Sequence, residues 1–158
     1  MTEPTALPAP PLIYLAQVRC DVEGLLSLGN APMGERRVVP LAGGEVVGPR
    51  LNGRILPGGA DWQWNRADGA LEIAAHYVIE TPEGARIEVQ STGLRHGPPE
   101  VLARLARGDA VSPDEYFFRT LMRFATGHAA YEHLNRVMAL ARGRREARRV
   151  VLDVWQVG

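Results

Sequence analysis

The stretch LEIAAHYVIETPEGARIEVQSTGL, residues 71–94, decides the fold class of this chain. Apolar and polar side chains alternate along residues 71–81 and 86–94, and this period of two is typical of β-strands. The intervening Pro82-Glu83-Gly84 has the composition of a tight turn, so the stretch predicts a long antiparallel hairpin. Both faces of its first strand carry large or polar side chains. A barrel with a ligand-sized interior tolerates polar groups inside, whereas a packed sandwich core does not, so we predict a barrel.

Similar alternation continues on both sides of this hairpin. In the first expected strand, one face carries Leu12, Tyr14, Ala16, Val18, Cys20 and Val22. Further short strands are expected over residues 35–41, 45–47, 50–56, 61–66, 116–124, 137–141 and 150–157. Residues 101–107 have helical spacing, residues 127–134 fit one more helical turn, and residues 27–34 are expected to form a loop. The sequence therefore predicts an all-β antiparallel barrel with one or two short helices.

The length of 158 residues fits one domain. Residues 1–11 contain proline and threonine but no positively charged segment, so we expect them to form a disordered leader. Residues 12–158 are expected to form the single barrel domain. No apolar run approaches the ~20 residues that a membrane helix needs, so we expect a cytoplasmic protein without a membrane partner.

The composition narrows the possible chemistry. Basic and acidic residues balance at 18 each, so no overall field favours nucleic acid as a partner. Every basic residue is an arginine, and the absence of lysine excludes Schiff-base chemistry. The single cysteine, Cys20, is expected to be a small buried hydrophobic residue. The histidines and glycines match no metal-binding or nucleotide-binding motif, so neither a metal nor a cofactor is expected. The basic run 142–149 is expected to be a solvated turn or an oligomer contact.

The candidate site centres on Asp61, within the stretch GPRLNGRILPGGADWQWNRADG at residues 48–69. This stretch places charged side chains beside tryptophans and glycines, a density of charge that a purely structural β segment does not need. If Trp62 or Trp64 removes water from Asp61, the pKa of the carboxyl group rises toward the range useful for general acid–base chemistry. The alternative is that Asp61 accepts backbone N–H bonds in the Gly58-Gly59 turn.

Three arginines in different expected strands are candidates to hold a ligand. Arg54, Arg66 and Arg119 can converge to clamp a carboxylate or an enolate, because arginine binds such groups through two parallel hydrogen bonds. The alternative for each arginine is an ordinary salt bridge to a glutamate, for which the sequence offers Glu72, Glu80 and Glu88.

Strand 71–81 carries two further candidates. Tyr77 and Glu80 lie on opposite faces, so they cannot both point inward unless a bulge intervenes. Tyr77 shares a face with apolar residues and is either a core residue or a ligand contact. Glu80 shares its face with His76, and this pair either moves protons near neutral pH or lies on the exposed outer surface.

Six segments of the chain carry a family resemblance. They are GPRLNGR (48–54), PGGADWQ (57–63), RADG (66–69), GLRHGPPE (93–100), YFFRT (116–120) and LNR (134–136). In order and spacing they resemble the bacterial family called domain of unknown function 3237, or uncharacterised protein family 0311. The resemblance spans nearly the whole chain after residue 12 and implies a calycin-like antiparallel β-barrel, often oligomeric. Two positions depart from the family pattern, Ala125 in place of an acidic residue and His133 in place of a tryptophan.

These features support three classes of function. The first is a small-molecule-binding barrel that acts as a cofactor-free acid–base enzyme (isomerase, cyclase or lyase) on an oxygenated or carboxylated organic substrate. The second is a non-catalytic binder or carrier, and the third is an oligomeric interaction protein. We expect a small-molecule ligand and a homo-oligomer. The candidate catalytic residues are Asp61, Arg66 and Glu80, and the candidate substrate-binding residues are Arg54, Trp62, Tyr77, Tyr116, Arg119 and Asn135.

Overall fold

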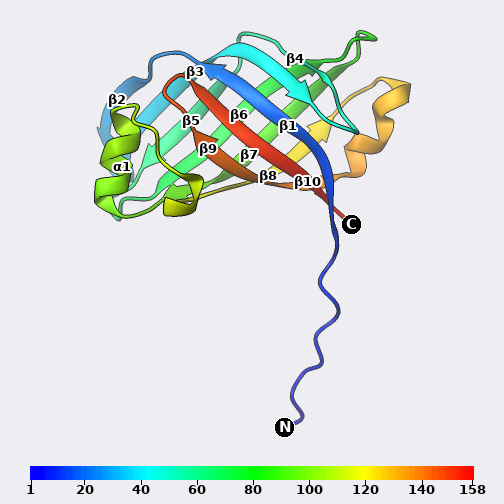
Figure 1. Ribbon diagram of the computed structural model, residues 1–158, viewed down its shortest axis with the longest axis horizontal. Coiled ribbons are helices and arrows are strands. Elements are labelled where there is room, and N and C mark those ends of the chain that lie inside the picture. The colour runs from blue at the N-terminus through cyan, green and yellow to red at the C-terminus, as the bar shows by residue number, and fades with distance from the viewer.

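The computed structural model describes all 158 residues, and most of them form one closed β-barrel (Figure 1). Its strands are β1 (Leu12–Val22), β2 (Leu26–Ala31), β3 (Gly34–Val47), β4 (Gly53–Ile55), β5 (Ala60–Asn65), β6 (Leu71–Glu80), β7 (Arg86–His96), β8 (Phe117–Ala125), β9 (Met138–Arg145) and β10 (Arg149–Val157). The helical segments are α1 (Pro99–Ala106) and the 3₁₀ helices η1 (Pro113–Glu115) and η2 (Ala129–Arg136). None of these helices is long and apolar enough to cross a lipid bilayer.

Antiparallel pairing closes the sheet into a barrel with eight strand positions. Hydrogen bonds connect β1, β10, β9, β8, β7 and β6 in that order, and the pairing of β1 with β3 closes the ring. The position between β6 and β3 is shared by β4 and β5, because β4 pairs with the end of β3 and β5 pairs with its beginning. The closed antiparallel barrel with few helices confirms the fold class predicted from the sequence.

Strand β3 and its neighbour β2 differ from the sequence-based expectation. Two short strands separated at Gly43-Gly44 were expected, but β3 continues through both glycines, which have φ angles of 135° and 141°. A Cβ atom on Gly44 would lie 2.1 Å from the carbonyl oxygen of Arg19, so glycine is required where β1 approaches β3. The expected loop at residues 27–34 is instead largely β2, which pairs with the first half of β3.

Strand β1 exchanges its inward and outward faces once. Ala16, Val18 and Cys20 are buried in the interior, as the alternation predicts. The register between β1 and β10 shifts between Tyr14 and Ala16, which marks a β-bulge. Because the extra residue reverses the alternation, Tyr14 points outward and its hydroxyl donates a hydrogen bond to Asp153 (3.0 Å).

The two ends of the barrel interior are filled differently. At the end near η2, Ile79, Ile87 and Leu134 are completely buried and belong to a continuous apolar core. Leu134 comes from η2, which covers this end of the barrel. At the opposite end lies α1, beside β2 (Figure 1), and there the interior remains open to a cavity. The candidate site is therefore confined to the α1 end.

Candidate functional site

A cavity of about 930 Å³ occupies the α1 end of the barrel. The inward faces of β1, β3 and β5 to β10 line it, and Leu102 and Leu105 of α1 lie at its mouth. The turns around Gly24, Gly69 and Ala147 complete the rim. This volume lies in the range typical of small-molecule sites, about 300–1,000 Å³. Hydrophobic side chains make up 17 of the 30 lining residues, so the cavity suits a ligand with an apolar body.

Asp61 is the acidic group inside this barrel. It lies on β5, and its side chain faces the cavity together with those of Gln63 and Asn65, because alternate residues of a strand share a face. One carboxylate oxygen accepts a hydrogen bond from the backbone N–H of Ala74 (3.0 Å), and the other accepts one from the side-chain amide of Gln63 (2.7 Å). These contacts differ from the alternative in which Asp61 caps the Gly58-Gly59 turn.

Burial makes Asp61 a weaker acid than an exposed aspartate. Removal from water raises its pKa, because the ionised form is disfavoured in an apolar environment. The two hydrogen bonds and the positive charges of Arg95 and Arg145 partly oppose this shift. The result is a carboxyl group that two hydrogen bonds hold in place and whose pKa lies above the ordinary value for aspartate.

Arg95 and Arg145 also face the cavity, and the sequence analysis missed both as site residues. Neither forms a salt bridge with a carboxylate. The Arg95 guanidinium lies 5.8 Å from the centre of the Phe118 ring. Burial and the nearby charge of Arg145 lower the pKa of Arg95 to about 10. Arg95 and Arg145 are thus cations in the cavity wall that form no salt bridge, whereas Arg37, which also lines the cavity, is paired with Glu35.

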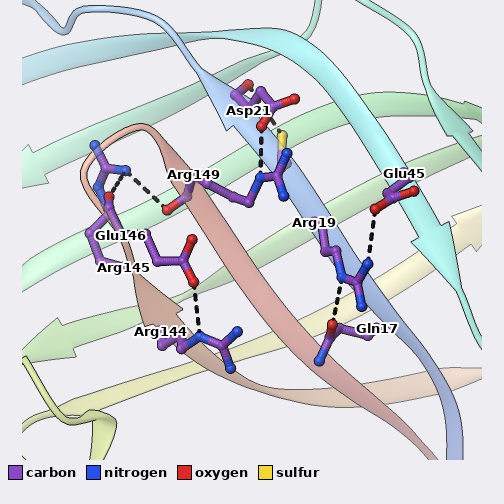
Figure 2. Close-up of polar contacts among 9 residues, drawn as sticks. Gln17, Arg19, Asp21, Glu45, Arg144, Arg145, Glu146 and Arg149 are labelled. Atoms are coloured by element: carbon purple, nitrogen blue, oxygen red, sulfur yellow. Dashed lines mark hydrogen bonds and ion pairs between the residues drawn. The ribbon is translucent and has the colours of Figure 1, made fainter. Parts of the chain in front are cut away.

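Arg145 belongs to the basic run 142–149, which was expected to be a solvated turn. Strand β9 extends as far as Arg145, and the alternation turns this side chain inward while Arg144 points outward. Figure 2 shows how the hairpin holds it: the Arg145 guanidinium donates hydrogen bonds to the carbonyl oxygens of Glu146 (2.5 Å) and Arg149 (3.2 Å). The remainder of the hairpin fits the solvated expectation, since Arg144 pairs with Glu146 on the surface.

Two hydroxyl groups in the cavity wall have no hydrogen-bond partner. Tyr77 on β6 is 5 % exposed and Thr120 on β8 is 2 % exposed, yet neither hydroxyl oxygen contacts another polar atom. Desolvation raises the pKa of Tyr77 well above its ordinary value, so its hydroxyl stays protonated and is available as a donor. Cys20 lines the same cavity, and burial raises the pKa of its thiol to about 12. Tyr77, which the sequence named as a candidate substrate-binding residue, therefore lines the same cavity as Asp61.

The structure places the arginine candidates and Glu80 outside the barrel. Arg54 and Arg86 both bind the Glu80 carboxylate, through contacts of 2.7 and 3.1 Å. Arg66 pairs with the hairpin residue Asp68. Strand alternation points Arg54, Arg86 and Glu80 outward, whereas Arg66 lies in the turn that follows β5. This arrangement corresponds to the ordinary salt bridges considered as the alternative.

Four more candidates lie away from the cavity. Arg119 lies 5.2 Å from the ring centre of Phe117 and donates a hydrogen bond to a backbone carbonyl. Trp62 lies on the outer face of β5 and is 42 % exposed, so it does not wall the cavity. Tyr116 is buried behind the lining, where its hydroxyl accepts a hydrogen bond from the backbone N–H of Arg145 (2.8 Å). Asn135 bonds to backbone atoms near η2, at the opposite end of the barrel.

No three histidine, cysteine, aspartate or glutamate side chains lie close enough together to hold a metal ion. The chemical groups that line the cavity are the carboxyl groups of Asp61 and, at the rim, Glu23, together with guanidinium groups, hydroxyls and a thiol.

The sequence and the structure of this chain both match proteins of one family. Residues 10–157 match the family described as protein of unknown function DUF3237. A UPF0311 protein of Rhodopseudomonas palustris is 40 % identical over 144 residues, which cover 91 % of this chain and 94 % of that protein. Its crystal structure superposes with a TM-score of 0.93 and covers 96 % of this chain and 100 % of that one. A β-barrel-like protein of Acinetobacter baumannii is 36 % identical, with a TM-score of 0.84 and coverage of 97 % and 99 %.

A fungal protein is similar at a greater distance. The hydroalkoxylation enzyme PhnH of Penicillium herquei is 41 % identical over 49 residues, which cover 31 % of this chain and 32 % of that protein. A crystal structure of an enzyme from the same organism superposes with a TM-score of 0.74 at 22 % identity and covers 99 % and 100 % of the two chains, a likeness of fold. From the match over residues 10–157 and the bacterial relatives, the chain belongs to the DUF3237 (UPF0311) family.

Proposed function

We propose that this protein binds a small oxygenated or carboxylated organic molecule in the barrel cavity and transfers a proton on it without a cofactor. The observation that carries this proposal is the Asp61 carboxyl group inside a largely apolar cavity, fixed by Gln63 and Ala74 and with a raised pKa. A carboxyl group in such a setting can give a proton to a substrate and take one back within the pH range in which proteins work.

The unpaired guanidinium groups of Arg95 and Arg145 complement this role. Proton transfer to or from an oxygenated substrate creates or moves negative charge on oxygen. Fixed cations in a cavity stabilise that charge more strongly than water does, because the surroundings are already oriented and partly desolvated. Asp61 is thus the proposed acid and base, and the two arginines are the proposed groups that hold the oxygen.

One specific reaction is favoured by the fungal relative, whose name specifies hydroalkoxylation. In that reaction a hydroxyl group adds across a carbon–carbon double bond of the same molecule and forms a cyclic ether. Asp61 would give its proton to one alkene carbon while the oxygen bonds to the other carbon, and the hydroxyl proton would then return to the carboxylate. Atoms and electrons balance within the substrate, so no oxidant, reductant or cofactor takes part.

The test uses a phenol with an alkenyl side chain beside the hydroxyl, 2-(3-methylbut-2-enyl)phenol, as the probe. Turnover in D₂O should add one deuterium to carbon in the cyclic product, which mass spectrometry detects. Asp61→Asn should lower the rate by about 10²- to 10⁴-fold, the usual contribution of a general acid–base group. Asp114→Asn is the matched control, because Asp114 is an exposed aspartate that pairs with Arg142 outside the cavity.

The competing functions predict different outcomes of this experiment. A carrier would bind the probe, give no product and tolerate Asp61→Asn. An oligomeric interaction protein would not bind members of a wider library of aromatic acids, lactones and polyketide-like compounds in a thermal-shift screen. Full turnover by Asp61→Asn would remove Asp61 from the mechanism.

A further inference from the structure

The polar groups of the cavity are ordered along its length. On β7, Arg95 pairs with Leu71, and six residues away Val89 pairs with Tyr77. Six residues of a β-strand span roughly 20 Å, so the Cα atoms of Arg95 and Tyr77 lie far apart along the barrel wall. Asp61 lies between these levels, because its partner Ala75 is located between Leu71 and Tyr77 on β6. The cavity therefore has two distinct polar ends with Asp61 between them.

The mouth end is positively charged. Arg95 and Arg145 both line the cavity there, and the charge of each acts on the Asp61 carboxyl group. The Coulomb repulsion from Arg145 also disfavours the charged form of Arg95. Two like charges that are partly withdrawn from water are unfavourable in the free protein, and the Asp61 carboxylate offsets them only in part, because it forms no salt bridge with either arginine. An anionic group in the cavity would supply the missing partner.

The floor of the cavity differs from the mouth, because its polar groups are hydroxyls and not cations. The hydroxyl of Tyr77 is buried without a partner, although buried hydroxyl groups in proteins are almost always hydrogen-bonded. Thr120, whose hydroxyl is also unpartnered, lies part of the way toward the mouth, where it pairs with Gly93 on β7. The Tyr77 hydroxyl can donate a hydrogen bond to a ligand oxygen that accepts one.

We propose that the ligand is an elongated amphiphilic organic anion, with an oxyanion held by Arg95 and Arg145 at the mouth and a second oxygen that accepts a hydrogen bond from Tyr77 at the floor. This inference rests on the proposed binding function and adds the charge, polarity and orientation of the ligand. The apolar body lies between the two ends, against the hydrophobic lining and beside Asp61. The orientation leaves the reacting centre of the ligand in the middle of the cavity.

The test uses four rod-shaped probes that differ only in their ends. They are 4′-hydroxybiphenyl-4-carboxylate, biphenyl-4-carboxylate, 4-phenylphenol and 4′-hydroxybiphenyl-4-carboxamide. Titration calorimetry gives the Kd of each probe for the unaltered protein, for Arg95→Met and for Tyr77→Phe. Both variants keep the size of the side chain approximately, and neither removes a salt bridge or a protein hydrogen bond, so both are expected to fold, which circular dichroism and thermal melting verify.

The hydroxy-carboxylate should bind most tightly to the unaltered protein. Arg95→Met should weaken binding of the two carboxylates by about 10- to 150-fold, the range for a lost hydrogen bond to a charged group, and leave the neutral probes unchanged. Tyr77→Phe should weaken the probes that carry the hydroxyl by about 2- to 10-fold and leave biphenyl-4-carboxylate unchanged. Arg119→Met is the control, because this arginine lies on the outer face.

Equal loss of all four probes in Arg95→Met, or equal Kd values for the carboxylate and the carboxamide in the unaltered protein, would overturn the inference. In either case the cavity would still bind small molecules, so the proposed function would survive. If none of the four probes binds at millimolar concentration while all variants are folded, the inference and the proposed binding function fail together.

Discussion

Replacement of Arg95 by methionine should make the free protein more stable. The Arg95 guanidinium is partly buried, has no carboxylate partner and lies near a second cation, Arg145. A folded-state pKa below the unfolded-state pKa means that the charged form is less favourable in the folded protein. This penalty is present in full at every pH below about 10 and is relieved only as the pH rises through that value. At neutral pH the unaltered protein therefore carries the whole cost.

The size of the effect follows from the pKa and from one compensating contact. Burial and the charge of Arg145 lower the pKa of Arg95 to about 10, and at 1.36 kcal/mol for each pKa unit below the ordinary value of arginine the cost is roughly 3 kcal/mol. The guanidinium also lies 5.8 Å from the Phe118 ring centre, a contact worth about 0.5–1 kcal/mol that methionine does not reproduce. After allowance for water that still reaches the mouth, we expect a net gain of about 1–2 kcal/mol.

Differential scanning calorimetry at pH 7 measures this gain. For a protein of 158 residues, 1 kcal/mol shifts Tm by roughly 2–4 °C, so Arg95→Met should raise Tm by about 2–8 °C. The matched control is Arg119→Met, because Arg119 also lies over a phenylalanine ring but on the outer face. That control should change the free energy of unfolding by no more than about 0.5 kcal/mol.

A fall in Tm for Arg95→Met larger than that of the control would refute this reasoning. It would show that the guanidinium is stabilised by the surrounding protein, so that the mouth of the cavity does not favour an added anion.

Three further predictions concern other groups. The Asp61 carboxyl group should titrate above the ordinary range for aspartate in ¹³C NMR, and Arg95→Met should raise its midpoint further, because a favourable positive charge is removed. Cys20 should react with iodoacetamide at pH 8 at least ~100-fold more slowly in the folded protein than in urea, because its thiol has a pKa of about 12. Gly93→Ala should cost at least about 3 kcal/mol in urea denaturation, since its Cβ would lie 2.0 Å from a backbone oxygen.

For each of these three predictions, one experimental result would contradict the physical reason given. An Asp61 midpoint that stays unchanged in Arg95→Met would mean that the two charges do not interact through the cavity. Rapid alkylation of folded Cys20 would show that the thiol is ionised or exposed. Gly127→Ala is the control for Gly93→Ala, because no atom lies within 4 Å of its Cβ position, and equal stability of the two variants would contradict the steric argument.

The direction of many side chains in the barrel could be predicted from the alternation of apolar and polar residues along the chain. Leu71, Ile73 and Tyr77 share the inward face of β6, as the period of two requires, and the same rule turns Glu80 outward. The alternation also contains a signal for Arg95 that the sequence analysis did not use. Arg95 lies an even number of residues from the buried Ile87 and Val89, so all three side chains share one face of β7. The strand expected from the sequence ended at residue 94, one residue before Arg95.

Other features depend on contacts that no local pattern reveals. Arg54 and Glu80 are separated by 26 residues, and they meet because β4 and β6 are paired. Tyr14 reverses its expected face because of a bulge opposite β10. Gly43 and Gly44 read as a strand break, yet the close approach of β1 makes them part of a continuous strand.

The sequence by itself predicted an antiparallel β-barrel and the family, because side-chain alternation and motif order are local properties of the chain. It named Asp61 and Glu80 as candidate carboxylates without deciding which strand face lines the cavity, and the structure places Asp61 in the cavity and Glu80 outside it. Only the tertiary structure decided which arginines face the cavity, since all 18 basic residues are of one type and differ only in where pairing and strand length place them. The candidate site exists only because eight strand positions close around one interior. That closure buries the Tyr77 hydroxyl without a hydrogen-bond partner and sets the distance between Tyr77 and Arg95 at the two ends of the cavity.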